Sequence, residues 1–591
     1  MSQKPSVDRP SARAWQAAGR ALVAKALAEL AFEELLVPDE VGPGRYQLDL
    51  EGHRYAFSAR RGGFGSWRLD PESVSRDGQP AADPVQLVLD GRPQLGLDGP
   101  TAAEVVRELI ATQTADARIL SGGKDAAALA DLGYAELEQH LTGHPVLVLN
   151  KGRLGFTADD LERYAPEARG EIRLRWYAAH TSVATYTAVP GLDQRTLLDE
   201  ELGPDTVAAF DAVLDRQVSC PEEYVWLPVH PYQDANVVRP LFARHLAEGL
   251  LVPLGEGTPS YRPLQSVRTL AAPGHRDVKT PLLMRNTLVW RGLGTQATAA
   301  APDISDWLGT LHTSDADLRD TGIGFLREVA SVVVRHDAFE SVSDAPYRYG
   351  ELLGVVWRES ASSHLGADER ARSLAALLHT DGAGGSVVAE LVARSGLGSR
   401  EWLRRLFDAL FPGLLHCLTR HGVAFCPHGE NTVVVYDASD VPRRVLVKDF
   451  AEDINLLPGR HYPGLSESAD GVLVRWPAGE LAHSIISAVL AGHFRFFAGV
   501  VEDALGVEET EFWSLVHDSL LSWRTRHPGL SDSFDALGLL APEVERIALN
   551  REHLTGGGFH DRSERDAAPD VVHGHVPNPL ALSGANAEVG P

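Results

Sequence analysis

A chain of 591 residues is too long to bury its apolar side chains in a single hydrophobic core. At roughly 150 residues per domain, we expect three or four domains. No apolar run approaches the roughly 20 residues that a membrane span requires. The N-terminus, MSQKPSVDRPSARAWQ, lacks the apolar stretch of a secretion signal. We therefore predict a multidomain cytoplasmic protein that does not bind membranes.

The net charge of the chain limits the kinds of molecule that it can bind. Its formal net charge of -26 argues against a nucleic-acid-binding protein, because phosphate backbones are held by many clustered cations. Cys220, Cys417 and Cys426 are widely separated and match no zinc spacing, so we expect reduced thiols. Lysine is rare, with six residues against a large excess of arginine. A lysine in such a chain indicates that a compact ammonium is needed there.

Periodicity and turn residues predict a mixture of helices and strands. Apolar spacing predicts a helix over residues 11–37 with Ser11 as its cap. Residues 45–95 are expected to form short strands, including PVQLVLDG (84–91), and helices are expected near 100–120 and 125–142. A helix over 399–422 precedes a hairpin, and further helices occupy about 478–553. The tail from Gly556 is rich in Gly, Pro and Ala, and we predict that it is partly disordered.

The stretch HGENTVVVYDASDVPRRVLVKD (428–449) reads as a β-hairpin with polar ends. The turn DASD brings His428, Glu430 and Asn431 near Asp449. Two carboxylates with an amide oxygen form a hard-oxygen set that suits Mg²⁺. The alternative is a hairpin with solvated ends, but its strand centres look buried, and charges at the ends of buried strands need partners.

A second cluster of polar residues lies in PLQSVRTLAAPGHRDVKTPLLMRNTLVWRGL (263–293). If 264–270 and 277–291 pair as neighbouring strands, alternate side chains share one face. The side chains that could share this face are those of Ser266, Arg268, Lys279 and Arg291, and Thr269 lies close to Ser266 and Arg268 in the chain. Such a face suits a polyanion held by side-chain cations and hydroxyls rather than by a glycine-rich loop. The alternative, that these are surface charges on sheet edges, stays open at this point.

Two further motifs carry weaker signals. GHPVLVLNKGRLGF (143–156) contains His144, Lys151 and Arg153 around an apolar run, and by itself it is typical of a strand followed by a solvated turn. In LPVHPYQ (227–233), His230 lies between apolar residues and a proline. We interpret it as a structural histidine.

Taken together and in order, these motifs resemble those of the IucA/IucC family of NRPS-independent siderophore synthetases, most closely the desferrioxamine and alcaligin synthetase branch. The similar segments run from about residue 135 to 553 and include YAPEARGEIRLRW, APDISDWL, VLVKDFAEDI and LNREHL. The resemblance implies an α+β fold of thumb (1–195), fingers (196–395) and palm (396–555), shaped like a cupped hand, with antiparallel sheets, a C-terminal helical bundle and a tail (556–591).

The family resemblance also implies a reaction and its cofactors. A carboxylate attacks the α-phosphate of ATP, pyrophosphate leaves, and an amine or hydroxyl captures the acyl-adenylate with Mg²⁺ present. By resemblance, ATP is bound by Ser266, Arg268, Thr269, Lys279, His428, Asn431 and Asp449. The metal is assigned to Glu430 and Asp449, the catalytic roles to Lys279, Arg291 and His428, and the substrate to His144, Lys151, Arg153 and Arg291. A homodimer is also implied.

One motif departs from the family pattern. The first motif usually reads GHPxHPxxK, whereas this chain has Leu147 and Val148 in place of the second histidine and proline. We hypothesise a changed substrate preference. The acyl donor is expected to be a succinyl-hydroxamate type of acid or citrate, and its partner a hydroxylated diamine. Two other functions stay open: a phosphotransferase, which would release ADP, and a degenerate protein that binds nucleotide or carboxylate without catalysis.

Overall fold

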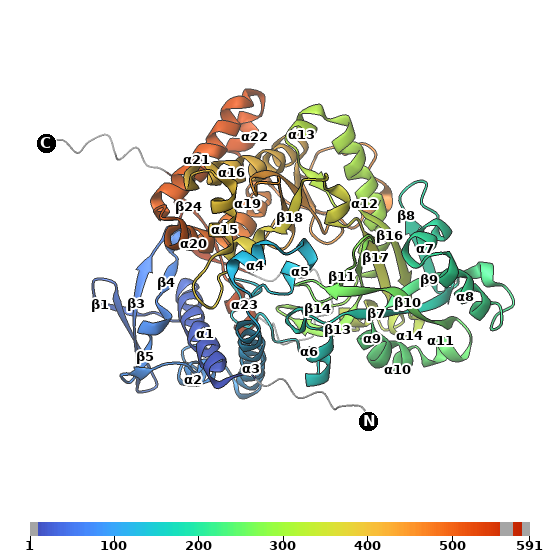
Figure 1. The fold of residues 1–591 in the computed structure, drawn as a ribbon, viewed down its shortest axis with the longest axis horizontal. Coiled ribbons are helices and arrows are strands. Elements are labelled where there is room, and N and C mark those ends of the chain that lie inside the picture. Colours follow the sequence, from blue (N-terminus) through green and yellow to red (C-terminus); the bar gives the residue numbers. More distant parts are fainter. Residues whose placement is uncertain (1–9, 556–570, 582–591) are drawn as a thin grey trace.

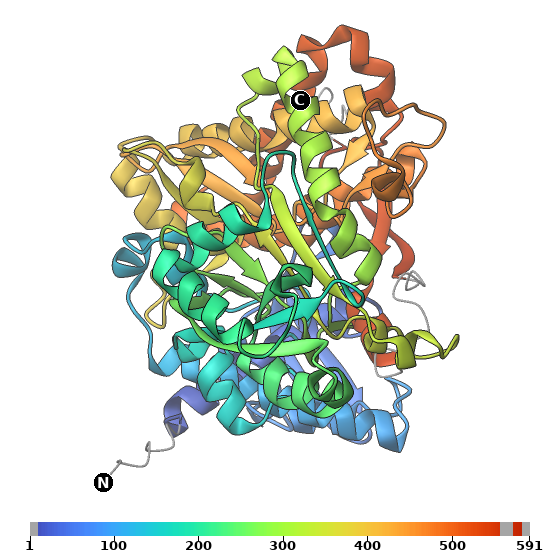
Figure 2. The same ribbon diagram turned by 90° about the vertical axis from the view of Figure 1, so that its right-hand side faces the viewer.

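The computed structural model describes residues 10–555 and 571–581 and is built from helices and mainly antiparallel sheets. Figure 1 shows the N-terminal segments in blue, a sheet-rich central region in green and the C-terminal helices in orange and red. In the perpendicular view the blue segments lie at the bottom and the red helices at the top (Figure 2). The predicted α+β class is confirmed.

The N-terminal region consists of a helix pair beside a six-stranded sheet. Helix α1 (Ala12–Phe32) begins at Ser11, whose hydroxyl accepts a hydrogen bond from the backbone N–H of Ala14, as predicted. It packs against α3 (Gly99–Ser121). Strands β2 (Arg45–Leu50), β3 (His53–Arg61) and β4 (Trp67–Leu69) fall where strands were expected.

Three local predictions for this region were wrong. Residues 84–91 form helix α2 (Pro84–Asp90), because Asp83 caps two backbone N–H groups and Pro84 suits the first helical turn. Helix α1 ends at Phe32, because Glu34 takes a positive φ of 56°. The helix expected over 125–142 is broken into α4 (Ala126–Ala130) and α5 (Tyr134–Glu138).

The central region is built on an eight-stranded antiparallel sheet with the order β8-β16-β17-β12-β11-β10-β7-β9. Its strands are β7 (Ile172–His180), β8 (Ala184–Ala188), β9 (Tyr224–Val229), β10 (Leu251–Pro263), β11 (Thr269–Ala271), β12 (Asp277–Lys279), β16 (Glu328–Val334) and β17 (Gly354–Arg358). Strands β11 and β12 pair as expected, with Thr269 opposite Lys279. Residues 282–291 instead form a separate hairpin of β13 (Leu282–Asn286) and β14 (Val289–Arg291). Helix α12 (Thr295–Ser314) packs against β16.

The C-terminal region places a four-stranded sheet against a helical bundle. Strands β20 (Thr432–Tyr436) and β21 (Pro442–Val447) form the predicted hairpin, with Thr432 opposite Val447. The sheet is completed by β15 (Gly324–Phe325) and β18 (Arg370–Ser373). Helix α16 (Ser399–His416) packs on β21 and on α21 (Glu509–Arg526). The valines at the centre of β20 are fully buried, which confirms that the hairpin lies in the core.

One helical stretch, Ala478–Leu505, is long and apolar enough to cross a membrane by length and composition, contrary to the sequence prediction. It packs inside the protein, and 61% of its most apolar window is buried. It includes α20 (Arg495–Leu505), whose Phe497 and Val501 belong to the largest hydrophobic cluster. Its apolar character is therefore explained by core packing.

Three large hydrophobic clusters correspond broadly to the three regions, but the largest also recruits distant segments. Phe32, Leu137 and Trp307 belong to the same cluster as the C-terminal helices. The domain boundaries at 195, 395 and 555 stay predictions. Of the predicted tail, residues 571–581 are described and contain β25 (Val572–Pro577), which pairs with β24 (Glu543–Ile547). The rest of the tail lies outside the described residues.

A buried ion pair joins the first helix to the C-terminal bundle. Both guanidinium Nη atoms of Arg495 donate to the Glu29 carboxylate, at 3.2 and 2.7 Å. Both side chains are only 2% exposed. The guanidinium also lies 3.9 Å from the centre of the Phe32 ring. These contacts tie residues 466 positions apart in the chain.

We predict that Arg495→Met lowers the free energy of unfolding by about 3–5 kcal/mol, because Glu29 would keep a buried charge without its partner. Urea unfolding followed by tryptophan fluorescence measures this loss. The double variant Glu29→Leu with Arg495→Met should regain most of the stability. Arg400→Ala, which removes an exposed partner of Glu511, should cost less than about 1 kcal/mol. A loss for Arg495→Met no larger than for Arg400→Ala would contradict the prediction.

Candidate active site

A cavity of about 970 Å³ opens between the central sheet and the end of the β20–β21 hairpin. Segments far apart in the sequence contribute to its wall, including the first turn of α12 and residues 471–474. The structure brings together nine residues that the sequence analysis singled out: Ser266, Arg268, Thr269, Lys279, Arg291, His428, Glu430, Asn431 and Asp449. The two polar motifs therefore face one space.

The sheet side of the cavity is built by a tight turn and two short strands. Between β10 and β11, Val267 has a φ of 68°, and Ser266 Oγ accepts a hydrogen bond from the N–H of Thr269 at 3.2 Å. This turn carries Arg268, whose side chain is almost fully buried. Arg291 reaches the cavity from the β13–β14 hairpin, and its Nη2 donates to Thr287 Oγ1 at 2.9 Å.

The cations of the cavity are paired with carboxylates from the segment after β21. Lys279 Nζ lies 3.1 Å from Asp449 Oδ1 and 3.3 Å from Glu452 Oε2. Arg268 Nη2 donates to the same Glu452 oxygen at 2.7 Å. Burial alone would lower the pKa of Lys279, but the two carboxylates outweigh it and the pKa is raised. Lys279 is therefore a charged ammonium at neutral pH.

A buried arginine fixes the position of Asp449 from behind. Arg358 ends β17 and is 2% exposed. Its Nη2 donates to Asp277 Oδ2 at 2.7 Å, and its Nη1 lies 3.2 Å from both carboxylate oxygens of Asp449. Burial would raise the pKa of Asp449, but Lys279 and Arg358 hold it well below its usual range. Asp449 is therefore a fixed anion.

The hairpin end presents an imidazole, an amide and further carboxylates. His428 Nδ1 accepts hydrogen bonds from the backbone N–H groups of Glu430 and Asn431 at 3.2 and 3.3 Å. Burial is the main cause that lowers its pKa, so the ring is neutral at pH 7 and its proton sits on Nε2. Asn431 Nδ2 donates to Asp453 Oδ2 at 2.9 Å. Burial, with Asp449 and Glu452 nearby, raises the pKa of Asp453 to about 7.

The motif GHPVLVLNKGRLGF (143–156), which was predicted to contact substrate, is not among the described segments that line the cavity. Burial, with the charges of His428, Lys25 and Arg291, lowers the pKa of His144 to about 3, and this side chain is not among the described residues that line the cavity. Its Nδ1 accepts from the N–H of Leu147 at 3.2 Å. The expected strand is absent from this described segment, which forms turns with Leu147 and Val148 buried.

Lys151 and Arg153 are buried and paired inside the protein. Lys151 Nζ donates to Asp116 Oδ1 at 2.8 Å and to Asn150 Oδ1 at 2.7 Å. Arg153 binds Glu167 through two hydrogen bonds. Neither cation belongs to the described residues that line the cavity. Both cations are therefore paired with acids inside the protein, and their predicted contact with substrate stays a prediction.

His230 is fully buried and caps a short helix, with its Nδ1 accepting from the N–H of Tyr232 at 3.0 Å. This agrees with the structural interpretation made from its sequence context. We therefore assign His230 no role in the cavity.

Sequence reasoning missed three charged residues at this site: Arg358, Glu452 and Asp453. The acidic pair follows directly after Lys448-Asp449 in VLVKDFAEDI, so its position beside the predicted metal ligands was a usable signal. Arg358 follows the apolar run GVVW. No periodic pattern along the chain indicates that this cation is buried with two acidic partners. Its role depends on the pairing of β12 with β17, which places Asp277 opposite Arg358.

The chain was compared with known proteins. The IucA/IucC family profile matches residues 133–379, and the profile described as ferric iron reductase FhuF-like transporter matches residues 400–560. The rhizobactin siderophore biosynthesis protein RhbF of Rhizobium meliloti (strain 1021) is 34% identical over 579 residues, covering 96% of both chains.

Solved structures agree with the sequence comparisons. The aerobactin synthetase IucC from a hypervirulent Klebsiella pneumoniae pathotype is 33% identical, covers 91% of this chain and 97% of its own, and superposes with a TM-score of 0.83. The ATP-bound aerobactin synthetase IucA from the same source is 17% identical and has a TM-score of 0.77, with coverages of 95% and 99%, which shows a shared fold. With matches of this extent, the chain belongs to the IucA/IucC family of NRPS-independent siderophore synthetases, a family of ATP-dependent acid–amine ligases.

Proposed function

We propose that this chain activates a carboxylic acid as its acyl-adenylate in the cavity and joins it to an amine by an amide bond. The observation that carries the proposal is the convergence of Arg268, Lys279 and Arg291 with the carboxylates of Glu430 and Asp449 around one space. Cations in fixed positions stabilise the negative charge of a phosphoryl-transfer transition state. A hard-oxygen set beside them suits a divalent ion bound to nucleotide phosphates.

In the first step, an oxygen of the substrate carboxylate forms a bond to the α-phosphorus of ATP, and the bond from that phosphorus to pyrophosphate breaks. Arg268, Lys279 and Arg291 would balance the charge on the phosphate oxygens. His428 would add a neutral N–H donor at Nε2, because its Nδ1 is already used by two backbone N–H groups. Ser266 and Thr269 would add hydroxyl donors on the sheet side.

The position of Glu452 supports the placement of the phosphates. One of its carboxylate oxygens lies between Arg268 Nη2 and Lys279 Nζ, at 2.7 and 3.3 Å. An anionic oxygen therefore fits between these two cations. In the proposed complex, a phosphate oxygen that binds both cations would replace the carboxylate of Glu452.

Glu430 and Asp449 would hold Mg²⁺, and the donor set fits this ion because both side chains line the cavity as carboxylates beside Asn431. When bound, Mg²⁺ neutralises charge on the phosphates. Arg358 orients Asp449 for this role, because its guanidinium donates hydrogen bonds to both carboxylate oxygens of Asp449.

In the second step, the amine nitrogen attacks the acyl carbon, AMP leaves and the nitrogen loses a proton. We propose a succinyl-hydroxamate type of acid or citrate as acyl donor, and a hydroxylated diamine as acceptor. His144 is the substrate contact that we retain from the first motif, because the charges of His428 and Arg291 contribute to its lowered pKa, although His144 is not among the described residues that line the cavity. A homodimer, a cytoplasmic location and the relation to the desferrioxamine and alcaligin branch remain part of the proposal.

The test is ATP–pyrophosphate exchange with a panel of succinyl-hydroxamates, succinate and citrate, followed by identification of the nucleotide product. We expect acid-dependent exchange with one acid class and release of AMP when the amine is added. ADP as the product would instead indicate a phosphotransferase. No exchange with any acid, while ATP still binds, would favour the non-catalytic alternative.

We predict that Lys279→Met lowers kcat/KM for pyrophosphate exchange by about 10²–10³-fold, because the buried ammonium faces the phosphate charge that develops in the transition state. Lys124→Met is the matched control, since Lys124 is exposed, and it should change the rate by less than about twofold. A loss of less than about threefold for Lys279→Met would remove Lys279 from the proposed catalytic set.

We predict that Arg358→Lys raises the Mg²⁺ concentration needed for half-maximal exchange by about tenfold, although it keeps the charge. A lysine ammonium cannot present the planar fork that spans Asp277 and Asp449. Arg327→Lys is the control, because Arg327 pairs with Glu359 in a more exposed position. An unchanged Mg²⁺ dependence for Arg358→Lys would show that Asp449 needs no such support.

We predict that Leu147→His changes KM for the acid or the amine by about threefold or more and leaves KM for ATP within twofold. The backbone N–H of Leu147 donates to the His144 ring, so a change at this buried position alters the setting of His144 first. Steady-state kinetics with each substrate varied in turn measures the effect. Leu147→Met, which keeps an apolar side chain of similar volume, should leave all three KM values near those of the parent.

A further inference from the structure

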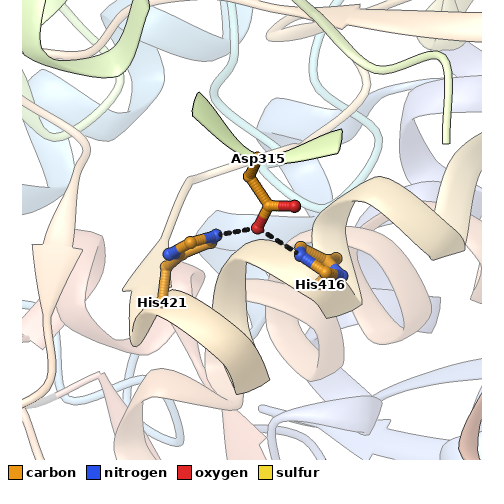
Figure 3. Close-up of side chains that lie close together, drawn as sticks. All are labelled: Asp315, His416 and His421. Carbon is orange, nitrogen blue, oxygen red and sulfur yellow. Dashed lines mark hydrogen bonds and ion pairs between the residues drawn. The ribbon is translucent and has the colours of Figure 1, made fainter. Parts of the chain in front are cut away.

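Outside the cavity, two histidines and an aspartate meet at the junction of three helical segments (Figure 3). Asp315 directly follows α12 and precedes α13 (Ala316–Asp320). His416 is the last residue of α16, and His421 is the last residue of the π-helical turn η9 (Cys417–His421). Neither histidine was singled out by the sequence analysis, and the proposed reaction uses none of the three side chains.

The π-helical turn explains how both imidazoles reach the same point. In an α-helix, residues five apart project about 140° from each other. In η9 the N–H of Gly422 instead bonds to the carbonyl of Cys417, five residues back, which brings positions five apart onto the same side. The rings of His416 and His421 consequently lie 5.5 Å apart between centroids. Such turns are rare and often occur at functional sites.

The carboxylate of Asp315 is fixed in front of these rings. Its Oδ1 accepts a hydrogen bond from the N–H of Leu318 at 3.1 Å and so caps α13. This leaves Oδ2 pointing at the histidines, with His416 Nε2 at 2.9 Å and His421 Nε2 at 2.7 Å. Three donor atoms from two separate chain segments therefore converge within 4.8 Å of one another.

This arrangement offers a metal ion three donor atoms. The Oδ2 atom of Asp315 can accept a hydrogen bond from each imidazole, so both Nε2 atoms converge on one carboxylate oxygen. A metal ion uses all three donors, and two imidazole nitrogens with one carboxylate oxygen are a common set for Zn²⁺. In a tetrahedral site with bonds of about 2.0–2.2 Å, the Asp315 oxygen and each Nε2 atom would separate by roughly half an ångström or slightly more.

The burial of the three side chains leaves one side of the cluster open. His416 is 2% exposed, whereas His421 and Asp315 are 18% and 16% exposed. A water molecule can therefore complete a tetrahedral set from the solvent side. We propose that Asp315, His416 and His421 form a binding site for a divalent transition metal ion, Zn²⁺ in the first instance, separate from the nucleotide cavity.

The site would connect two segments that both lead to the cavity. Helix α12 begins with cavity residues 295–297 and ends beside Asp315. From His421, the chain continues through β19 (Val423–Ala424) to His428 at the cavity wall. A bound ion would clip the far ends of these segments together, and its role would be to stabilise their packing.

The test uses the full chain after removal of metal with EDTA, and the probe is the metal alone. Zn²⁺ binding is measured by calorimetry, and Co²⁺ binding by its visible absorption. We expect the parent chain to bind Zn²⁺ at this site and to show a rise in melting temperature that EDTA reverses. His421→Gln and Asp315→Asn should weaken Zn²⁺ binding by at least about 100-fold; Asn preserves the helix cap.

Two controls separate this site from other metal ligands. The ring of His527 lies 6.4 Å from that of His416, and Nδ1 of His527 donates to the carbonyl of Trp523. His527→Gln should therefore leave the Zn²⁺ affinity unchanged. Glu430→Gln alters the proposed Mg²⁺ site and should also leave the Zn²⁺ signal in place. Because no substrate is used, the outcome does not depend on whether the chain adenylates an acid.

Unchanged Zn²⁺ binding in both His421→Gln and Asp315→Asn would overturn the proposal, as would a parent chain that binds no Zn²⁺. If the two variants fail to fold, X-ray absorption of the Zn²⁺-loaded parent chain decides the question. Two imidazole nitrogens at about 2.0–2.1 Å would support the site. A spectrum with one imidazole or none would reject it.

Discussion

The carboxylate of Asp449 is the contact on which the architecture of the cavity depends. It follows the β20–β21 hairpin, yet its partners Lys279 and Arg358 come from strands β12 and β17 of the central sheet. The carboxylate of Asp449 therefore joins the two sides of the cavity. Because Asp449 has a positive φ of 64°, the chain makes a local turn at this position, which aims the side chain back toward the sheet. Breaking this contact would separate the cations that we propose bind phosphate from the proposed metal ligands.

Several of the charges that line the cavity are paired with one another or with a charge behind them. Arg268 and Lys279 share Glu452, Arg358 joins Asp277 to Asp449, and the amide of Asn431 holds Asp453. Buried charges are tolerated only with partners, so the acidic residues make it possible to keep several cations in a nearly closed space. They also set a requirement for the ligand. A polyanion that displaces Glu452 must arrive with positive charge of its own, which fits a nucleotide bound to a divalent ion.

The sequence predicted the parts of this site that depend on local pattern. The β20–β21 hairpin was predictable because a polar turn separates two apolar runs. The pairing of β11 with β12 was also expected, but the register that places Thr269 opposite Lys279 came only from the structure. Arg358 was not predictable, because its partners are chosen by sheet order rather than by spacing along the chain. PVQLVLDG illustrates the opposite error, since Asp83 and Pro84 start a helix in a stretch whose composition favours a strand. The predicted substrate-binding roles of Lys151 and Arg153 stay predictions. Their burial was not predictable, because a cation that looks solvated in sequence can find an acid from another segment of the chain.

The scarcity of lysine acquires a physical meaning in the structure. Lys151, Lys279 and Lys448 are all at most 6% exposed, and Lys25 is partly buried, with its ammonium donating to the carbonyl of His144. Burial and the nearby charge of Lys151 lower the pKa of Lys25 to about 7, despite the opposing effect of Asp116. A guanidinium would be too wide for a position that offers a single carbonyl, whereas a compact ammonium fits. At Arg358 a planar fork joins two acids, whereas the ammonium of Lys25 donates to one main-chain oxygen. The ammonium of Lys279 faces the carboxylates of Asp449 and Glu452, and in the function that we propose a phosphate oxygen would take the place of Glu452.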